Sequence, residues 1–148
     1  MSNRHTFTTS RTLPFAPVAV YAAFASPEVL ASWWGPAGFI NSFEVFEFRE
    51  GGRWTFVMHG PDGAHYPNEC VFEALMPGAR VVIRHACAPF FTLVVTLAPS
   101  AGGTLFTWDQ TFDDAATAQT VQHIVVPANE QNLDRLTLAL RKADGASV

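Results

Sequence analysis

Charged residues are scarce in this sequence: they make up 15% of it, against roughly a quarter of an average soluble domain. The nine lysines and arginines are spread along the chain without a basic run, and the formal net charge is −4. A protein that holds a phosphate backbone needs a concentrated positive surface. We therefore expect no nucleic-acid partner.

Cysteines and long apolar runs are also rare. Cys70 and Cys87 are too few for a disulfide framework and form no Cys-x-x-Cys pair that would indicate zinc. We expect two free, reduced thiols. No run of about 18 apolar residues occurs, and the N-terminal segment has no apolar signal core. These absences predict a cytoplasmic protein without membrane insertion.

Apolar bulk is what the sequence has in abundance, with 49% hydrophobic residues, 13 phenylalanines and 4 tryptophans. A chain of 148 residues suits a single domain over residues 1–148. It can bury about two-thirds of its unfolded surface without a disulfide or a metal. Side chains of this size either fill a large core or leave an aromatic-lined cavity.

The order of apolar and polar residues predicts an α+β fold. The Thr-rich segment 4–12 is typical of a strand, and two short helices follow, the second capped by Ser26. From residue 43 to 112 the period changes to two, and glycine-bearing turns divide this region into six strands of an antiparallel meander. Helical spacing over 128–142 predicts a long last helix, and Pro127 is expected to break or kink the weakly helical stretch before it.

Three stretches resemble one protein family: LASWWGPAGF at 30–39, REGGRWTFVMHGPDGAHYPNE at 49–69 and NLDRL at 132–136. They are similar to the activator of heat-shock-protein-90 ATPase homologue-like family, in the START-like or Bet v 1-like (SRPBCC) superfamily. The resemblance implies a helix-grip fold, in which a seven-stranded antiparallel sheet wraps around a long C-terminal helix, with two short helices between the first two strands. It also implies a sheet–helix cavity, where members of the superfamily bind apolar molecules.

The sequence departs from this family at one place. Members often carry Gly-Trp or a similar pair ahead of the Gln-x-Leu-x-x-Leu stretch of the last helix. Here the same place reads Ala128-Asn129. An amide stands where relatives often have a large aromatic side chain, so the helix side of the cavity is expected to be roomier and more polar.

Strand parity indicates which side chains face this cavity, because successive residues of a strand point to opposite faces of a sheet. The predicted apolar lining consists of Trp54, Phe56, Phe72, Ile83, Leu93, Phe106, Trp108 and Leu133. The predicted polar contacts are Tyr66, Asn68, His85, Gln110 and Asn129. A buried amide without a partner costs about 1–3 kcal/mol. These polar groups are therefore expected to satisfy one another, or to meet trapped water or a ligand.

Histidines are the candidates for proton and metal chemistry. His85 is the catalytic candidate, because the pKa of a free imidazole lies near neutrality, although a lone strand histidine is more often structural. His59 and His65 flank a Gly-Pro-Asp-Gly turn and are expected to face each other, with Asp62 as the nearby carboxylate. A metal would need a third ligand, so we predict no metal site. No Ser-His-Asp set or phosphate-binding loop is visible, and we expect no cofactor.

Three functions fit these features. The first is a module that binds a small apolar or aromatic ligand without catalysis. The second is an enzyme for an aromatic or polyketide-like substrate, which would act through His85, Tyr66 or Asn68. The third is a co-chaperone-like interaction module, which should have a charged surface. In the SWWGP segment, one tryptophan is expected at the cavity mouth and the other on the surface, where it would favour a homodimer contact.

Overall fold

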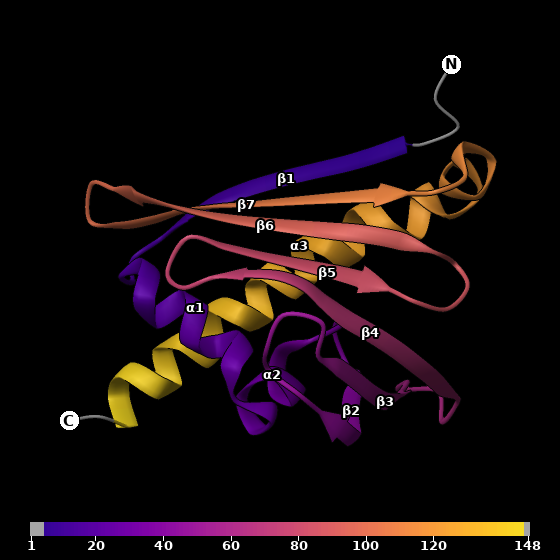
Figure 1. Cartoon of the computed structure of the whole chain (residues 1–148), viewed down its shortest axis with the longest axis horizontal. Coiled ribbons are helices and arrows are strands. Elements are labelled where there is room, and N and C mark those ends of the chain that lie inside the picture. The colour runs from indigo at the N-terminus through magenta and orange to yellow at the C-terminus, as the bar shows by residue number, and fades with distance from the viewer. Residues whose placement is uncertain (1–4, 147–148) are drawn as a thin grey trace.

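The computed structural model describes residues 5–146, and its elements follow the predicted order (Figure 1). The first three elements are strand β1 (His5–Leu13) and helices α1 (Pro17–Ala25) and α2 (Pro27–Trp33). The remaining elements are β2 (Ile40–Phe46), β3 (Arg53–His59), β4 (His65–Met76), β5 (Arg80–His85), β6 (Phe91–Ser100), β7 (Gly103–Phe112) and α3 (Ala115–Ala146). The predicted start of the first strand at residue 4 lies outside the described residues.

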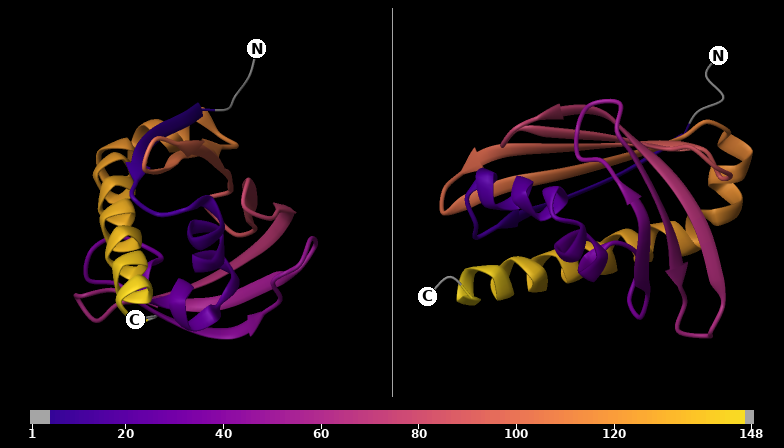
Figure 2. Two further views of the ribbon diagram at one scale, coloured as in Figure 1. Left: turned by 90° about the vertical axis from the view of Figure 1, so that its left-hand side faces the viewer. Right: turned by 60° about the horizontal axis from the view of Figure 1, so that its bottom comes forward.

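All seven strands form one antiparallel sheet in the order β1-β7-β6-β5-β4-β3-β2. The pairing register shifts between Phe43 and Val45 in β2 and between Phe72 and Ala74 in β4. Such bulges bend a strand and increase its twist. The sheet curves around α3 (Figure 2), so the predicted α+β helix-grip fold is confirmed.

The two short helices fill one end of the grip, between the sheet and the C-terminal half of α3 (Figure 2). The Ser26 hydroxyl accepts a hydrogen bond from the Val29 backbone N–H at 3.4 Å, which confirms the predicted cap of α2. Trp33 at the end of α2 is fully buried, and its indole nitrogen donates to the Ala23 carbonyl at 3.1 Å. This bond ties α2 to α1.

Helix α3 continues through Pro127, so of the two expected outcomes the kink is found and the break is not. Proline removes one backbone hydrogen bond and crowds the preceding turn, which bends a helix as readily as it ends one. Figure 2 shows α3 changing direction within its orange first part. The stretch before the proline is held by its cap, because the Asp114 carboxylate accepts from the Thr117 backbone N–H at 3.1 Å and from its hydroxyl at 2.7 Å. These hydrogen bonds lower the pKa of Asp114.

The main core lies between the concave face of the sheet and the helices. At its centre Trp54 stacks on Phe56 and Phe72, with ring centroids 4.9 Å and 5.3 Å apart. Leu133 and Leu136 of α3 are fully buried in the same cluster. Each fully buried side chain of this kind contributes about 1.5–3 kcal/mol. No helix within residues 5–146 is long and apolar enough to span a membrane.

Candidate functional site

A pocket of about 250 Å³ lies between the sheet and the first half of α3. Its apolar walls are formed by Trp34, Met58, Phe91, Trp108, Ile124 and Val125. Its polar side chains are Asn68, His85, Gln110, Asn129 and Asn132. The remaining lining residues are Gly35, Pro36, Pro89 and Ala128. The lining therefore carries no carboxylate, ammonium or guanidinium group.

The predicted site residues divide between this pocket and the solid core. Those that line the pocket are Asn68, His85, Trp108, Gln110 and Asn129. Those packed in the core are Trp54, Phe56, Phe72, Ile83, Leu93, Phe106 and Leu133. The second group faces inward, as strand parity requires, but α1, α2 and the second half of α3 fill the space over it. Parity identifies the inner face of a sheet and leaves open which part of that face is covered.

Tyr66 lies outside the pocket, in a neighbouring depression. The side chain is 46% exposed and lines an adjoining, more open depression together with Phe39 and Pro67. That depression and the pocket share Met58 and His85. At this end β4 extends beyond β5, so its first residues pair with β3 alone.

His85 is held by two protein oxygens. Its Nδ1 lies 2.7 Å from the Pro89 carbonyl and its Nε2 lies 2.6 Å from Asn68 Oδ1. Asn68 is itself oriented, because its Nδ2 donates to the Tyr66 carbonyl at 2.8 Å. The Phe91 ring stacks on the imidazole with centroids 4.5 Å apart. Burial lowers the pKa of His85, and the charge of Arg84 acts in the same direction. A neutral imidazole donates from only one ring nitrogen, but both nitrogens face protein atoms at close range, so neither is directed at a substrate.

The two cysteines are both free thiols, as predicted. Cys87 Sγ lies 3.5 Å from His85 Nε2 and 4.0 Å from the Glu69 carbonyl. Cys70 is fully buried, and this burial raises the pKa of its thiol well above the ordinary value. A thiol that resists ionisation is a poor nucleophile, so Cys70 is a core residue.

The amides of Gln110 and Asn129 meet across the pocket floor. Asn129 Nδ2 donates to Gln110 Oε1 at 3.0 Å, and both residues are buried. Next to Gln110 on the inner face of β7 is Trp108, whose indole nitrogen is buried without a hydrogen-bond partner among residues 5–146. The Gln110–Asn129 hydrogen bond joins β7 to α3. It depends on the amide at position 129, where relatives often have a large aromatic side chain.

The loop between α2 and β2 forms one wall of the pocket and is held by α3. The Arg135 guanidinium donates to five carbonyls of this region, which belong to Ser32, Trp34, Gly35, Pro36 and Phe39. Asn132 accepts from the Gly35 N–H at 3.1 Å and donates to the Trp33 carbonyl at 2.7 Å. Gly35 has a φ of 96°, a backbone conformation that favours glycine.

Sequence reasoning placed one tryptophan of this loop at the cavity mouth but missed Gly35, Pro36 and the bonds that hold the loop to α3. A signal for this contact was present in the sequence. LASWWGPAGF and NLDRL both carry the family resemblance, and in the structure these two segments contact each other. The expectation for the adjacent tryptophans is corrected in one respect. Trp34 lines the pocket, as expected of one of them, but Trp33 is fully buried and does not reach the surface. The packing of α2 on α1, with Trp33 donating to the Ala23 carbonyl, takes this side chain into the core.

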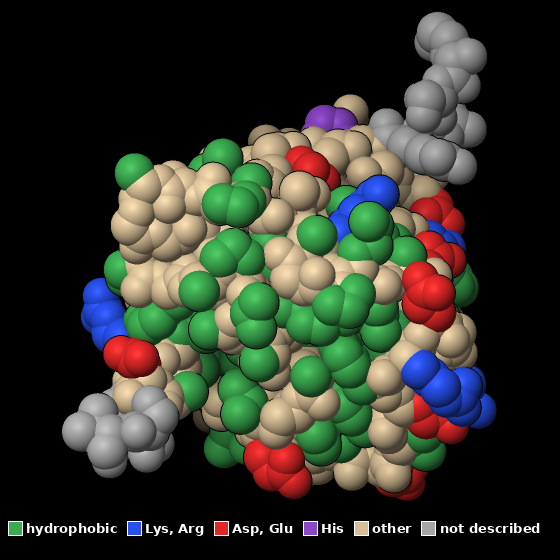
Figure 3. All heavy atoms as spheres, turned by 60° about the vertical axis from the view of Figure 1, so that its left-hand side comes forward, with side chains coloured by type: hydrophobic (Ala, Val, Ile, Leu, Met, Phe, Trp, Pro, Cys, Tyr) green, Lys and Arg blue, Asp and Glu red, His purple; other side chains and the backbone are tan. Residues whose placement is uncertain are grey.

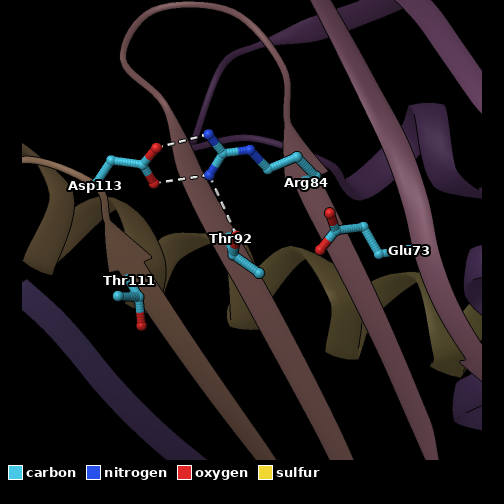
Figure 4. A pocket seen from close by; sticks show the side chains of 5 residues that line it. All are labelled: Glu73, Arg84, Thr92, Thr111 and Asp113. Atoms are coloured by element: carbon cyan, nitrogen blue, oxygen red, sulfur yellow. Dashed lines mark hydrogen bonds and ion pairs between the residues drawn. The ribbon is translucent and has the colours of Figure 1, made fainter. Parts of the chain in front are cut away.

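A second, polar depression lies on the outer face of the sheet (Figure 4). Arg84 and Asp113 form a bidentate pair with both N–O distances at 2.7 Å, and Arg84 also donates to Thr92 at 3.3 Å. The hydrogen bond to Asp113 raises the pKa of Arg84. Partly exposed pairs of this kind contribute about 1 kcal/mol or less. The Arg84–Asp113 ion pair therefore accounts for the polar lining of this depression, and it links β5 to the end of β7.

His59 and His65 face each other across the β3–β4 hairpin, as predicted. Their Nδ1 atoms lie 2.7 Å apart, and His59 Nε2 is 2.8 Å from the Ser42 hydroxyl. Within the part of the chain that the structure describes, no group of three metal-ligating side chains occurs here or elsewhere. The two histidines share a hydrogen bond at the hairpin.

An apolar face covers the end of the molecule where α1 and the β4–β5 turn lie (Figure 3). Hydrophobic side chains extend over the middle of this view, and most charged side chains lie towards its margins. Val18 on α1 and Met76 at the end of β4 are exposed, and Gly78 in the turn lies beside Val18. Trp33 and Trp34 are both buried and give no support to a homodimer contact, which stays a prediction.

Comparisons with known proteins agree with this architecture. The sequence profile of the family described as Activator of Hsp90 ATPase homolog 1-like protein matches residues 14–141. The chain belongs to this family. Its place in the START-like (SRPBCC) superfamily follows from the same match and from the fold. No curated protein sequence matches the chain.

Solved structures share the fold at low sequence identity. A crystal structure of a Nitrosomonas europaea protein has a TM-score of 0.83 at 21% identity, over 93% of this chain and 95% of that one. A solution structure from Arthrobacter aurescens gives 0.84 at 21% identity, over 93% and 86%. The AHSA1-like protein from Aeromonas hydrophila gives 0.72 at 20% identity, over 95% and 94%. The family and fold support a ligand-binding or interaction module in general.

Proposed function

We propose that this protein binds a small, largely apolar molecule in the pocket between the sheet and α3. The observation that supports this most directly is an apolar space with two tryptophans, Trp34 and Trp108, in its walls and a few buried amides at its floor. Small-molecule sites are typically built this way, with apolar walls for affinity and few polar groups for orientation.

Binding without catalysis accounts for the polar groups better than an enzyme does. His85 directs both ring nitrogens at protein oxygens, and Asn68 uses both ends of its amide. Tyr66, the other residue considered for catalysis, belongs to the neighbouring depression. General acid or base catalysis requires a group within hydrogen-bond reach of the reacting atom, so these residues favour a structural role.

A neutral fluorescent probe, N-phenyl-1-naphthylamine, tests this function. We expect saturable binding with quenching of tryptophan emission, because Trp34 and Trp108 line the pocket. Replacing Ala128 by Trp places an indole into the pocket from α3 and leaves the Gln110–Asn129 hydrogen bond intact. The Ala128→Trp variant should bind the probe at least about tenfold more weakly, a loss of about 1.4 kcal/mol.

The matched control is Ala116→Trp, the same change at an exposed position of the same helix. It should bind the probe as the parent protein does. Equal binding by Ala128→Trp and the parent would place the site elsewhere, and failure of the parent to bind would reject the proposed function.

A further inference from the structure

The pocket contains hydrogen-bonding groups that the protein leaves without a partner. The indole N–H of Trp108 is buried and bonds to none of residues 5–146. Gln110 and Asn129 each use one end of their amide in their mutual bond, and their other ends bond to no other described residue. All three side chains are more than nine-tenths buried and line the same pocket. Buried polar groups are normally satisfied, so groups left open in a pocket indicate where a ligand bonds.

The pattern of these open groups does not depend on the orientation assigned to the amides. As placed, Asn129 donates to Gln110, which leaves the Gln110 NH₂ and the Asn129 carbonyl open. If both amides were turned over, Gln110 would donate and the open groups would be one NH₂ and one carbonyl again. The Trp108 N–H has almost no exposed surface, like the N–H of Trp54 in the core, so it is not counted among the open groups. The amide pair itself offers the pocket one donor group and one acceptor.

The charge of the pocket selects among ligands that could use this pattern. The lining residues include no lysine or arginine to balance an anion, and His85, the one titratable side chain in the lining, is buried between two oxygens. A carboxylate accepts hydrogen bonds only, so it would set a negative charge against the open amide carbonyl. A pure hydrocarbon would leave all the open groups without partners.

We propose that the ligand is a neutral aromatic molecule whose polar end carries a carbonyl and an N–H side by side, as a carboxamide or a lactam does. The ligand carbonyl accepts from the open NH₂ of the amide pair, and the ligand N–H donates to the open amide carbonyl. The aromatic body lies between Trp34, Phe91 and Met58. This assignment rests on the proposed function and adds the chemistry of the polar end.

Three probes with one aromatic body and different polar ends test the assignment on the unmodified protein. They are 2-naphthamide, 2-naphthoate and 2-methylnaphthalene, each measured by displacement of N-phenyl-1-naphthylamine at pH 7.5. We expect the dissociation constant of 2-naphthamide to be at least about tenfold lower than those of the other two, which corresponds to about 1.4 kcal/mol.

A double variant, Gln110→Met/Asn129→Leu, removes both amides together, so that neither is left buried without its partner. It should bind 2-naphthamide no better than 2-methylnaphthalene, while 2-methylnaphthalene binds at least as well as before. Gln122→Met, on the exposed side of α3, is the matched control and should keep the preference for 2-naphthamide.

Each other result overturns the assignment in a recognisable way. Equal affinities of the unmodified protein for the three probes would mean that the amides do not recognise the polar end of the ligand, although the pocket still binds the aromatic body. Tightest binding of 2-naphthoate would identify an anion site. Preference for 2-naphthamide that survives in the double variant would place the polar contact elsewhere. If N-phenyl-1-naphthylamine itself does not bind, the proposed function fails together with the assignment.

Discussion

The role expected of His85 from the sequence differs from the role that the structure gives it. In the sequence it is a histidine on the inner face of a strand, with a free pKa near neutrality. In the structure its ring is fixed by the Pro89 carbonyl, by Asn68 Oδ1 and by stacking on Phe91. A charged imidazole would donate to both oxygens, whereas burial favours the neutral form, and burial is the larger effect.

The lowered pKa of His85 predicts a pH dependence of stability. The unfolded chain, with a histidine pKa of about 6.5, takes up the proton more readily than the folded protein, so acid weakens the fold. The free energy of unfolding should fall as the pH drops through about 6.5 towards the lowered pKa, and this contribution should then stay constant. Urea unfolding at pH 7.5 and 5.5 should show a smaller difference for His85→Gln than for the parent protein.

Other titrating groups contribute equally to both proteins, so the comparison isolates His85. His123 on α3 is exposed, and His123→Gln is the matched control that should retain the full pH difference. If His85→Gln and His123→Gln show the same pH difference, the folded and unfolded states hold the His85 proton equally well, contrary to this prediction.

At the scale of elements, the contact between α3 and the α2–β2 loop decides the shape of the pocket wall. A loop of this kind leaves carbonyls without partners, and the planar guanidinium of Arg135 satisfies five of them from one side. Burial lowers the pKa of Arg135, yet the group stays charged, because its ordinary pKa lies far above neutrality. Asn132 and Asn41 add bonds to Trp33, Trp34 and Gly35.

Arg135→Lys tests this contact while keeping the charge. An ammonium has three donors on one atom and cannot span carbonyls from Ser32 to Phe39, so we expect a loss of roughly 1.5–3 kcal/mol, the range for hydrogen bonds to charged groups. Urea denaturation gives the free energy of unfolding. Arg141→Lys, exposed on the same helix, should change it by less than about 0.5 kcal/mol. Similar values for both variants would show that the loop does not depend on the guanidinium.

At the scale of the whole molecule, the grip has a solid end and an open end. The short helices and the second half of α3 cover the concave face around Trp54 and Phe72, where side chains pack without exposure. The first half of α3, before and after Pro127, lies over the remaining part of that face and leaves the pocket there. The core that stabilises the fold and the proposed binding pocket therefore lie at different ends of the grip.

Leu133→Ala tests whether the core and the pocket are independent of each other. Leu133 is fully buried in the core and does not line the pocket, so we expect a loss of about 2–5 kcal/mol in the free energy of unfolding. The dissociation constant of N-phenyl-1-naphthylamine should stay unchanged. Leu138→Ala, on the exposed side of α3, should alter neither quantity appreciably. A large loss of probe affinity in Leu133→Ala would mean that core and pocket are one space.

The sequence by itself determined what depends on near neighbours along the chain. The strand period, the Ser26 cap and the glycine-bearing turns are local, so the element order could be predicted from them. The helix-grip fold was implied by the family resemblance, which agrees with that order. Strand parity also placed Trp54, Ile83 and Phe106 on the inner face correctly. For Pro127 the sequence left a break and a kink open, and the structure has the kink.

The tertiary structure alone decided which part of the inner face stays open. Arg135 reaches Ser32 across 103 residues, and Asn129 reaches Gln110 on a different element. Such partners are set by where the helices pack against the curved sheet, and parity along a strand contains no information about that position. For this reason Asn68, His85, Trp108, Gln110 and Asn129 line the pocket, while Phe72, Leu93 and Leu133, predicted by the same rule, became the core.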